Sequence, residues 1–127
     1  MIVVDASAMV EALVGQDVDD RLLDALQNSV CAPHLLDAEV LSVLRGLELS
    51  GKLPPRAAEQ ARMDYFALVI VRYEVSALAD RVWQLRHRYT TYDACYLALA
   101  EALDAPLYTC DRKLASGGHR AAIVAFP

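Results

Sequence analysis

The sequence predicts an α/β domain in which helices cover a central, mostly parallel sheet of four to five strands. Short apolar runs alternate along the chain with longer segments that have helical periodicity. The first run, "IVV", is apolar without interruption, as in strands that are buried on both faces. Strands that are joined through helices form right-handed crossovers, which make the sheet parallel and place helices on both of its faces.

Local signals justify the elements in order. Leu36, Val40 and Leu44 recur at helical spacing, and the "SGK" that follows ends their helix. Ser76 is expected to open a later helix, and Thr91 to cap the next one. In chain order we expect strand 2–4, helices 7–15 and 17–28, strand 30–33, helices 35–49 and 54–69, strand 70–75, helices 76–89 and 92–105, strand 106–109, short helix 111–116 and strand 121–126.

Length and composition indicate a single domain over residues 1–127. The hydrophobic fraction of 56% is enough for a core without disulfide or metal support. The formal net charge of −5 argues against a simple basic DNA-binding module. It does not exclude a nuclease whose excess acidic charge is neutralised by bound divalent metal.

Cysteine usage and the apolar runs point to the cytoplasm. The odd set Cys31, Cys95 and Cys110 suits a reducing compartment in which cysteines pack as small apolar residues. The N-terminus has no basic region, and Asp5 interrupts its apolar run, so we expect no secretory signal. The longest purely apolar run, "FALVIV", is too short to span a membrane.

Acidic residues stand at the ends of the predicted elements. Asp5 and Asp111 each follow a strand, and ligands on parallel sheets collect at the carboxyl ends of strands. Asp93 lies in the first turn of its helix, which also suits the helix dipole. Glu39 lies within a largely apolar helix, so its charge must be paired, metal-bound or on an exposed face near Arg45.

Together, these carboxylates could form an oxygen-only metal site. The histidines His34, His87 and His119 are scattered and do not have zinc-like spacing. Hard oxygen ligands without softer ones suit Mg²⁺ or Mn²⁺. Such a site can hydrolyse a phosphodiester by activating water and clamping the phosphate.

Four motifs in order resemble the PIN-domain ribonucleases, specifically the small VapC-type toxins of toxin–antitoxin pairs. The motifs are "VVDASAMV", "LLDAEVLSVLR", "TYDACYLALAEAL" and "LYTCDRKL", and they span essentially the whole chain. The resemblance implies a three-layer α/β/α sandwich and Mg²⁺- or Mn²⁺-dependent endoribonuclease activity. It also implies a transfer RNA or ribosomal RNA substrate, an inhibitory VapB-type antitoxin and a homodimer.

The resemblance further implies roles for individual residues. The residues that match the family's acidic quartet, catalytic and metal-binding, are Asp5, Glu39, Asp93 and Asp111. Ser7 and Thr109 match hydroxyl positions beside these acids, and Arg112 either contacts phosphate or pairs with a carboxylate. Ser42 departs from the family, in which many members carry asparagine, but it keeps a polar group on that face.

Three other classes of function have partly similar sequence features. A catalytically silent PIN-like interaction module is the main alternative, and the complete acidic quartet argues against it. A receiver-type signalling domain would need paired acids near the first strand, but Val4 and Ala6 flank Asp5. A haloacid-dehalogenase-type phosphatase would need a second aspartate two residues later, where this chain has Ser7. Arg86, Arg88, Arg112 and Lys113 are candidates for RNA contacts, and a solvated basic face is the alternative for each of them.

Overall fold

A computed structural model describes all 127 residues and contains one five-stranded sheet in which every neighbouring pair of strands is parallel. The strand order is β3-β2-β1-β4-β5. The chain therefore moves outward from β1 in one direction and then in the other, so the gap between the ends of β1 and β4 is a topological switch point. The strands are β1 Ile2–Val4, β2 Val30–Pro33, β3 Ile70–Tyr73, β4 Leu107–Thr109 and β5 Ile123–Ala125.

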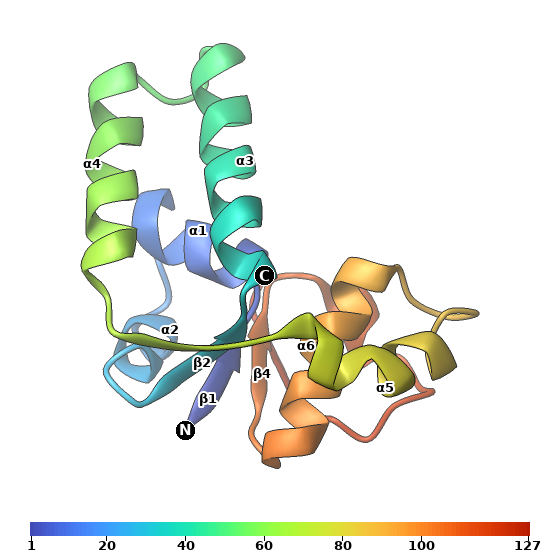
Figure 1. Cartoon of the computed structure of the whole chain (residues 1–127). Coiled ribbons are helices and arrows are strands. Elements are labelled where there is room, and N and C mark those ends of the chain that lie inside the picture. The colour runs from blue at the N-terminus through green and yellow to red at the C-terminus, as the bar shows by residue number, and fades with distance from the viewer.

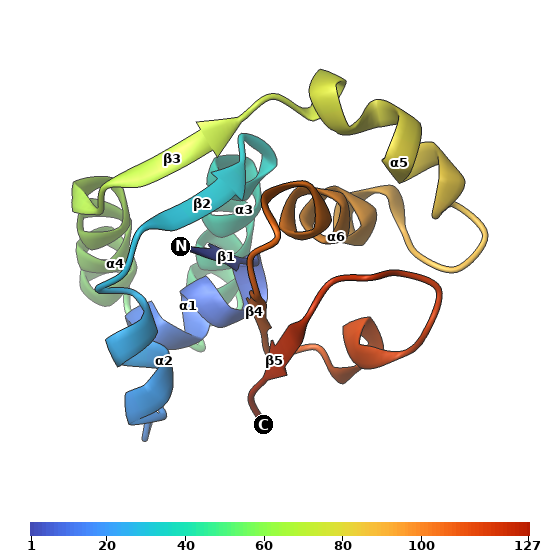
Figure 2. The ribbon, with the colours of Figure 1, turned by 90° about the horizontal axis from the view of Figure 1, so that it is seen from below.

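Helices cover both faces of this sheet. Figure 2 shows α5 and α6 on one side of the strands and α1, α2 and α4 on the other. The predicted α/β/α sandwich with a parallel sheet is therefore confirmed. The helices are α1 Ala6–Val14, α2 Asp20–Ala25, α3 Leu35–Leu49, α4 Pro55–Ala67, α5 Ala79–Gln84 and α6 Thr91–Leu103, with short 3-10 helices η1 Val75–Leu78 and η2 Arg112–Ala115.

Helices α3 and α4 form an antiparallel pair that extends beyond the carboxyl edge of the sheet (Figure 1). A polar contact ties the base of this pair to edge strand β3. The guanidinium of Arg72 donates to both carboxylate oxygens of Asp37 at 2.9–3.0 Å, and the Tyr65 hydroxyl donates to Asp37 at 2.6 Å. Because Glu39 lies two residues after Asp37, this contact also holds the part of α3 that carries Glu39.

The central element of the core is α6. Its residues 94–100 are all buried, and it packs on β1, β2 and β4. A helix that is buried on all sides has little freedom to shift, because its side chains are close-packed in every direction. Asp93, in the first turn of α6, is therefore carried on a rigid support.

Three local predictions differ from the structure. The expected helix 17–28 is only α2, because Asp17 has a left-handed φ of 54° and Asp19 caps the helix. The expected helix 76–89 is a 3-10 turn followed by the short α5, and the Ser76 hydroxyl bonds to Glu74 instead of capping. Thr90, not Thr91, caps α6, through a bond from the Asp93 amide at 3.1 Å. No helix combines the length and apolar content that crossing a bilayer requires.

Candidate active site

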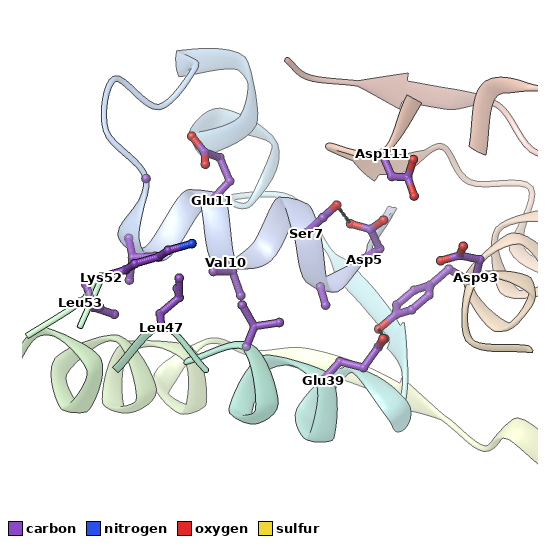
Figure 3. A pocket seen from close by; sticks show the side chains of 15 residues that line it. Asp5, Ser7, Val10, Glu11, Glu39, Leu47, Lys52, Leu53, Asp93 and Asp111 are labelled. Carbon is purple, nitrogen blue, oxygen red and sulfur yellow. Dashed lines mark hydrogen bonds between the residues drawn. The ribbon is translucent and has the colours of Figure 1, made fainter. Parts of the chain in front are cut away.

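A cleft of about 590 Å³ opens at the carboxyl edge of the sheet and is called the acidic cleft below. All four predicted acids line it: Asp5, Glu39, Asp93 and Asp111. Figure 3 shows their carboxylates gathered around one end, with Lys52 and Leu53 at the other. The structure therefore brings together residues that are up to 106 positions apart in the sequence, and it does so at the switch point between β1 and β4.

Asp5 is the most buried of the four acids and is held by three donors. Its carboxylate caps α1 by accepting from the Ala8 amide at 3.0 Å. The Ser7 hydroxyl donates to Oδ1 at 2.6 Å, and the Thr109 hydroxyl donates to Oδ2. Burial raises the pKa of Asp5 above its ordinary value, the three hydrogen bonds oppose that rise, and the charge of Asp111 adds to it.

The two predicted hydroxyl residues also connect Asp5 to the segment that carries Asp111. Ser7 Oγ accepts from the Cys110 amide at 2.9 Å, and Thr109 Oγ1 accepts from the Asp111 amide at 2.9 Å. Each hydroxyl thus donates to the Asp5 carboxylate and accepts from the backbone after β4. These bonds set the position of Asp111 relative to Asp5.

Glu39 points into the acidic cleft and is held by Tyr96, whose hydroxyl donates to Oε1 at 2.6 Å. Burial is the largest cause that raises the pKa of Glu39, Tyr96 opposes it, and the charges of Asp5 and Asp93 add to the rise. The alternative of a merely exposed face near Arg45 is wrong, since Glu39 is half-buried in the acidic cleft and Arg45 lines a separate depression between α3 and α4.

Sequence reasoning missed Tyr96. Its position carried a signal, because it lies three residues after Asp93 and residues at that spacing share a helix face. Lys52, in the turn after α3, was also missed and lines the cleft opposite the acids.

Asp93 and Asp111 complete the acidic end of the cleft. Burial raises the pKa of Asp93, the charges of Asp111 and then Asp5 add to this, and Thr90 and Lys113 oppose it. Asp111 caps η2 by accepting from the Lys113 amide at 2.9 Å. Asp111 can both cap η2 and face the acidic cleft, because the cap engages only its Oδ1 atom.

The donor set of the cleft suits a hard cation. All four candidate ligands are carboxylates, and the raised pKa values of Asp5, Glu39 and Asp93 reflect burial and mutual repulsion that a cation would relieve. As these side chains stand, no three acidic, histidine or cysteine groups come close enough to hold a metal ion. The residues therefore fit a metal by chemistry and by location, and binding requires the carboxylates to approach one another.

Arg112 is exposed on η2 and takes part in none of the ion pairs of the chain. The interpretation of Arg112 as a structural partner for a carboxylate is therefore wrong. A contact with phosphate remains compatible with its exposure.

Comparison with known proteins identifies the family. The sequence model of the PIN domain matches residues 2–119. The chain belongs to the PIN domain family. Among PIN domain relatives, Ribonuclease VapC1 of Mycobacterium tuberculosis (strain ATCC 25618 / H37Rv) is 46% identical over 117 residues, which cover 90% of this chain and 88% of that protein. VapC ribonuclease Mb0985 of Mycobacterium bovis is 40% identical over 118 residues, which cover 93% of this chain and 91% of that protein. The predicted PIN-domain, VapC-type family is confirmed.

Solved structures share the PIN domain fold. PAE2754 from Pyrobaculum aerophilum superposes with a TM-score of 0.69 at 23% identity, over 89% of this chain and 81% of that one. Mycobacterium tuberculosis VapC20, described as a sarcin–ricin loop cleaving toxin, superposes with a TM-score of 0.66 at 20% identity. The superposition covers 94% of this chain and 97% of that one. At these identities the likeness concerns the fold.

Proposed function

We propose that this PIN domain protein is a Mg²⁺- or Mn²⁺-dependent endoribonuclease and the toxin of a toxin–antitoxin pair. The observation that carries this proposal is the convergence of four carboxylates from β1, α3, α6 and the β4 end on the acidic cleft. The VapC relatives at 40–46% identity are named ribonucleases, which supports the same reaction here. We further propose that residues 1–127 form a single PIN-like domain.

Asp5, Glu39, Asp93 and Asp111 are the proposed metal-binding and catalytic residues. When bound, the ion supplies Lewis-acid charge at the phosphate and lowers the pKa of water. The carboxylates differ in how they are held. Asp5 is fixed by Ser7 and Thr109, and Glu39 is fixed by Tyr96, so both offer preset positions. Asp93 and Asp111 are half-buried, as Glu39 is, and complete the set.

The acidic cleft alone repels RNA, and exposed cations beside it offset this. Arg112 and Lys113 follow Asp111 directly and take part in no ion pair. Lys113 lies close enough to Asp93 to lower the pKa of that carboxyl. We assign Arg112 and Lys113 to contacts with substrate phosphates, which bind Arg and Lys side chains through charge-assisted hydrogen bonds.

The biological setting follows from the VapC-type family membership. Transfer RNA or ribosomal RNA is the proposed substrate, and a VapB-type antitoxin is the proposed inhibitor. A homodimer in the cytoplasm, without membrane attachment, completes the proposal. The odd cysteine set, all free thiols in the structure, is consistent with a reducing compartment.

Cleavage of RNA by the purified protein tests this function. Activity should stop with EDTA and return with Mg²⁺ or Mn²⁺. Asp93→Asn should reduce cleavage to background, because asparagine keeps the shape of the side chain but removes the charge. Asp64→Asn is the matched control, since Asp64 is exposed on α4 and bonds only to Gln60. Cleavage that persists without metal would refute the metal requirement, and no cleavage with either metal would favour a silent interaction module.

A further inference from the structure

Beside the acidic cleft lies a second, smaller cavity of about 290 Å³. We call it the Tyr92 hollow, and its lining residues are Leu35, Ala38, Glu39, Ser42, Val43 and Tyr92. Glu39 and Val43 line both cavities, so the hollow continues the surface of the acidic cleft along α3. A group bound in the hollow would therefore lie next to the reacting phosphate.

Tyr92 is the aromatic wall of this hollow and has no evident role in stabilising the fold. The residue is 60% exposed, although it directly precedes Asp93 on the rigid helix α6. Three other tyrosines, Tyr65, Tyr89 and Tyr96, use their hydroxyls within the fold, whereas Tyr92 makes no such bond. An exposed aromatic ring with a fixed backbone is what single-stranded RNA binding uses for base stacking.

The chemistry of the lining suits the neutral part of a nucleotide. Leu35, Ala38 and Val43 give an apolar surface, and Ser42 offers one hydroxyl that can bond to a base edge. The volume lies just below the range of about 300–1,000 Å³ that holds drug-sized ligands, which suits a single base. Glu39 is the only carboxylate in the lining and faces the acidic cleft as well.

We propose that the Tyr92 hollow binds the base of a nucleotide next to the scissile phosphate, stacked on the Tyr92 ring. The proposal rests on the proposed ribonuclease function and extends it by naming a base-binding subsite. It requires the RNA to be unpaired at that nucleotide, because a base within a duplex cannot leave its stack to reach the ring without a cost. Binding in the hollow therefore favours RNA that is single-stranded at this nucleotide.

A double-mutant cycle between the protein and its substrate tests the subsite. The protein variants are Tyr92→Ala and Tyr92→Phe, and the substrates are a single-stranded RNA with and without one abasic nucleotide on either side of the cleavage site. Tyr92→Ala should lower kcat/KM on intact RNA by about 5-fold or more, the lower end of what one base–aromatic stack contributes. Tyr92→Phe keeps the ring and should retain most of the activity.

The abasic substrates separate stacking from a general loss of activity. At one of the two flanking positions, base removal should slow the wild type by a similar factor and leave Tyr92→Ala unaffected, because the contact can be lost only once. Phe66→Ala is the matched protein control. Phe66 lies on α4, is 46% exposed and lines neither cavity. Its removal should leave kcat/KM unchanged on both the intact and the abasic RNA.

Three other outcomes would overturn the proposed base-binding subsite. If wild type cleaves RNA but the loss from Tyr92→Ala and the loss from base removal multiply when combined, the hollow does not bind that base and the ribonuclease function stands. The same conclusion holds if Tyr92→Ala cleaves intact RNA at the wild-type rate. If Tyr92→Ala cleaves normally but escapes inhibition by its antitoxin, the hollow is a protein contact instead. If wild type cleaves no RNA with Mg²⁺ or Mn²⁺, the proposed function fails together with the subsite.

Discussion

Replacement of Tyr96 by phenylalanine should weaken both the fold and the acidic cleft. The change removes one hydroxyl, whose 2.6 Å bond connects α6 to Glu39 on α3, and leaves the buried ring in place. Glu39 then loses the donor that opposes the rise of its pKa. The variant therefore separates a positioning role of Tyr96 from its packing role.

The expected loss follows from the strength of the bond and the exposure of Glu39. A hydrogen bond to a charged group contributes about 1.5–3 kcal/mol, and water can replace part of it because Glu39 is only half-buried, so we expect ~1–1.5 kcal/mol. For 127 residues the entropy of unfolding is roughly 0.27 kcal/mol per kelvin, so the melting temperature should fall by ~4–6 °C.

The loss should depend on pH with a defined sign. The folded-state pKa of Glu39 is already above the ordinary value of 4.5, and removal of the Tyr96 hydroxyl raises it further. A raised folded pKa reduces stability above that pKa, and the reduction disappears as pH falls through it. The difference in melting temperature between wild type and Tyr96→Phe should therefore be largest at neutral pH and shrink in mild acid.

The matched control is Tyr65→Phe, which removes another 2.6 Å bond from a buried tyrosine to a carboxylate on α3. Asp37 keeps its bonds from Arg72, and its pKa is lowered, so this variant should show no pH dependence between neutral pH and mild acid. Thermal unfolding is measured for each protein with and without Mg²⁺. Tyr96→Phe alone should lose part of the stabilisation by Mg²⁺, since groups that orient metal ligands typically change metal affinity by about 10–100-fold.

Two results would refute this reasoning. Equal pH dependence in both variants would mean that the Tyr96 hydroxyl does not stabilise a charged Glu39. Equal stabilisation of wild type and Tyr96→Phe by Mg²⁺ would mean that Glu39 does not contribute to a metal site.

Three further predictions concern the same cleft. Without metal, Asp93→Asn should raise the melting temperature at neutral pH but not in acid, because the raised pKa of Asp93 makes its charge unfavourable only above that pKa; a lower melting temperature at neutral pH would contradict this. Asp5→Asn should stabilise less than Asp93→Asn in the same unfolding measurement, because Asp5 also caps α1 and accepts bonds from two hydroxyls. An antitoxin should insert an arginine among the acids, and a structure of the complex in which it contacts only surfaces away from Asp5 and Asp111 would argue against this.

Much of the fold and of the site was predictable from local patterns. Apolar runs such as "IVV" specify strands because their side chains must leave water, and the apolar spacing of α3 specifies a helix for the same reason. Asp5 and Asp111 directly follow such runs or lie one residue beyond them, so the topology of parallel strands places them at one edge. The ordered motifs added Glu39 and Asp93 through their resemblance to the PIN-domain ribonucleases.

Only the tertiary structure decided which residues meet across the chain. The strand order that makes β1 and β4 neighbours depends on how helices pack on both faces, and no single segment encodes it. The bond from Tyr96 to Glu39 joins residues 57 positions apart, and its geometry exists only once α6 is buried on the sheet beside α3. Likewise, the predicted helix 76–89 ends early, and the Tyr89 hydroxyl bonds to the carbonyls of Ser116 and Gly117. Sequence periodicity reports which residues avoid water, whereas these contacts depend on the simultaneous packing of distant elements.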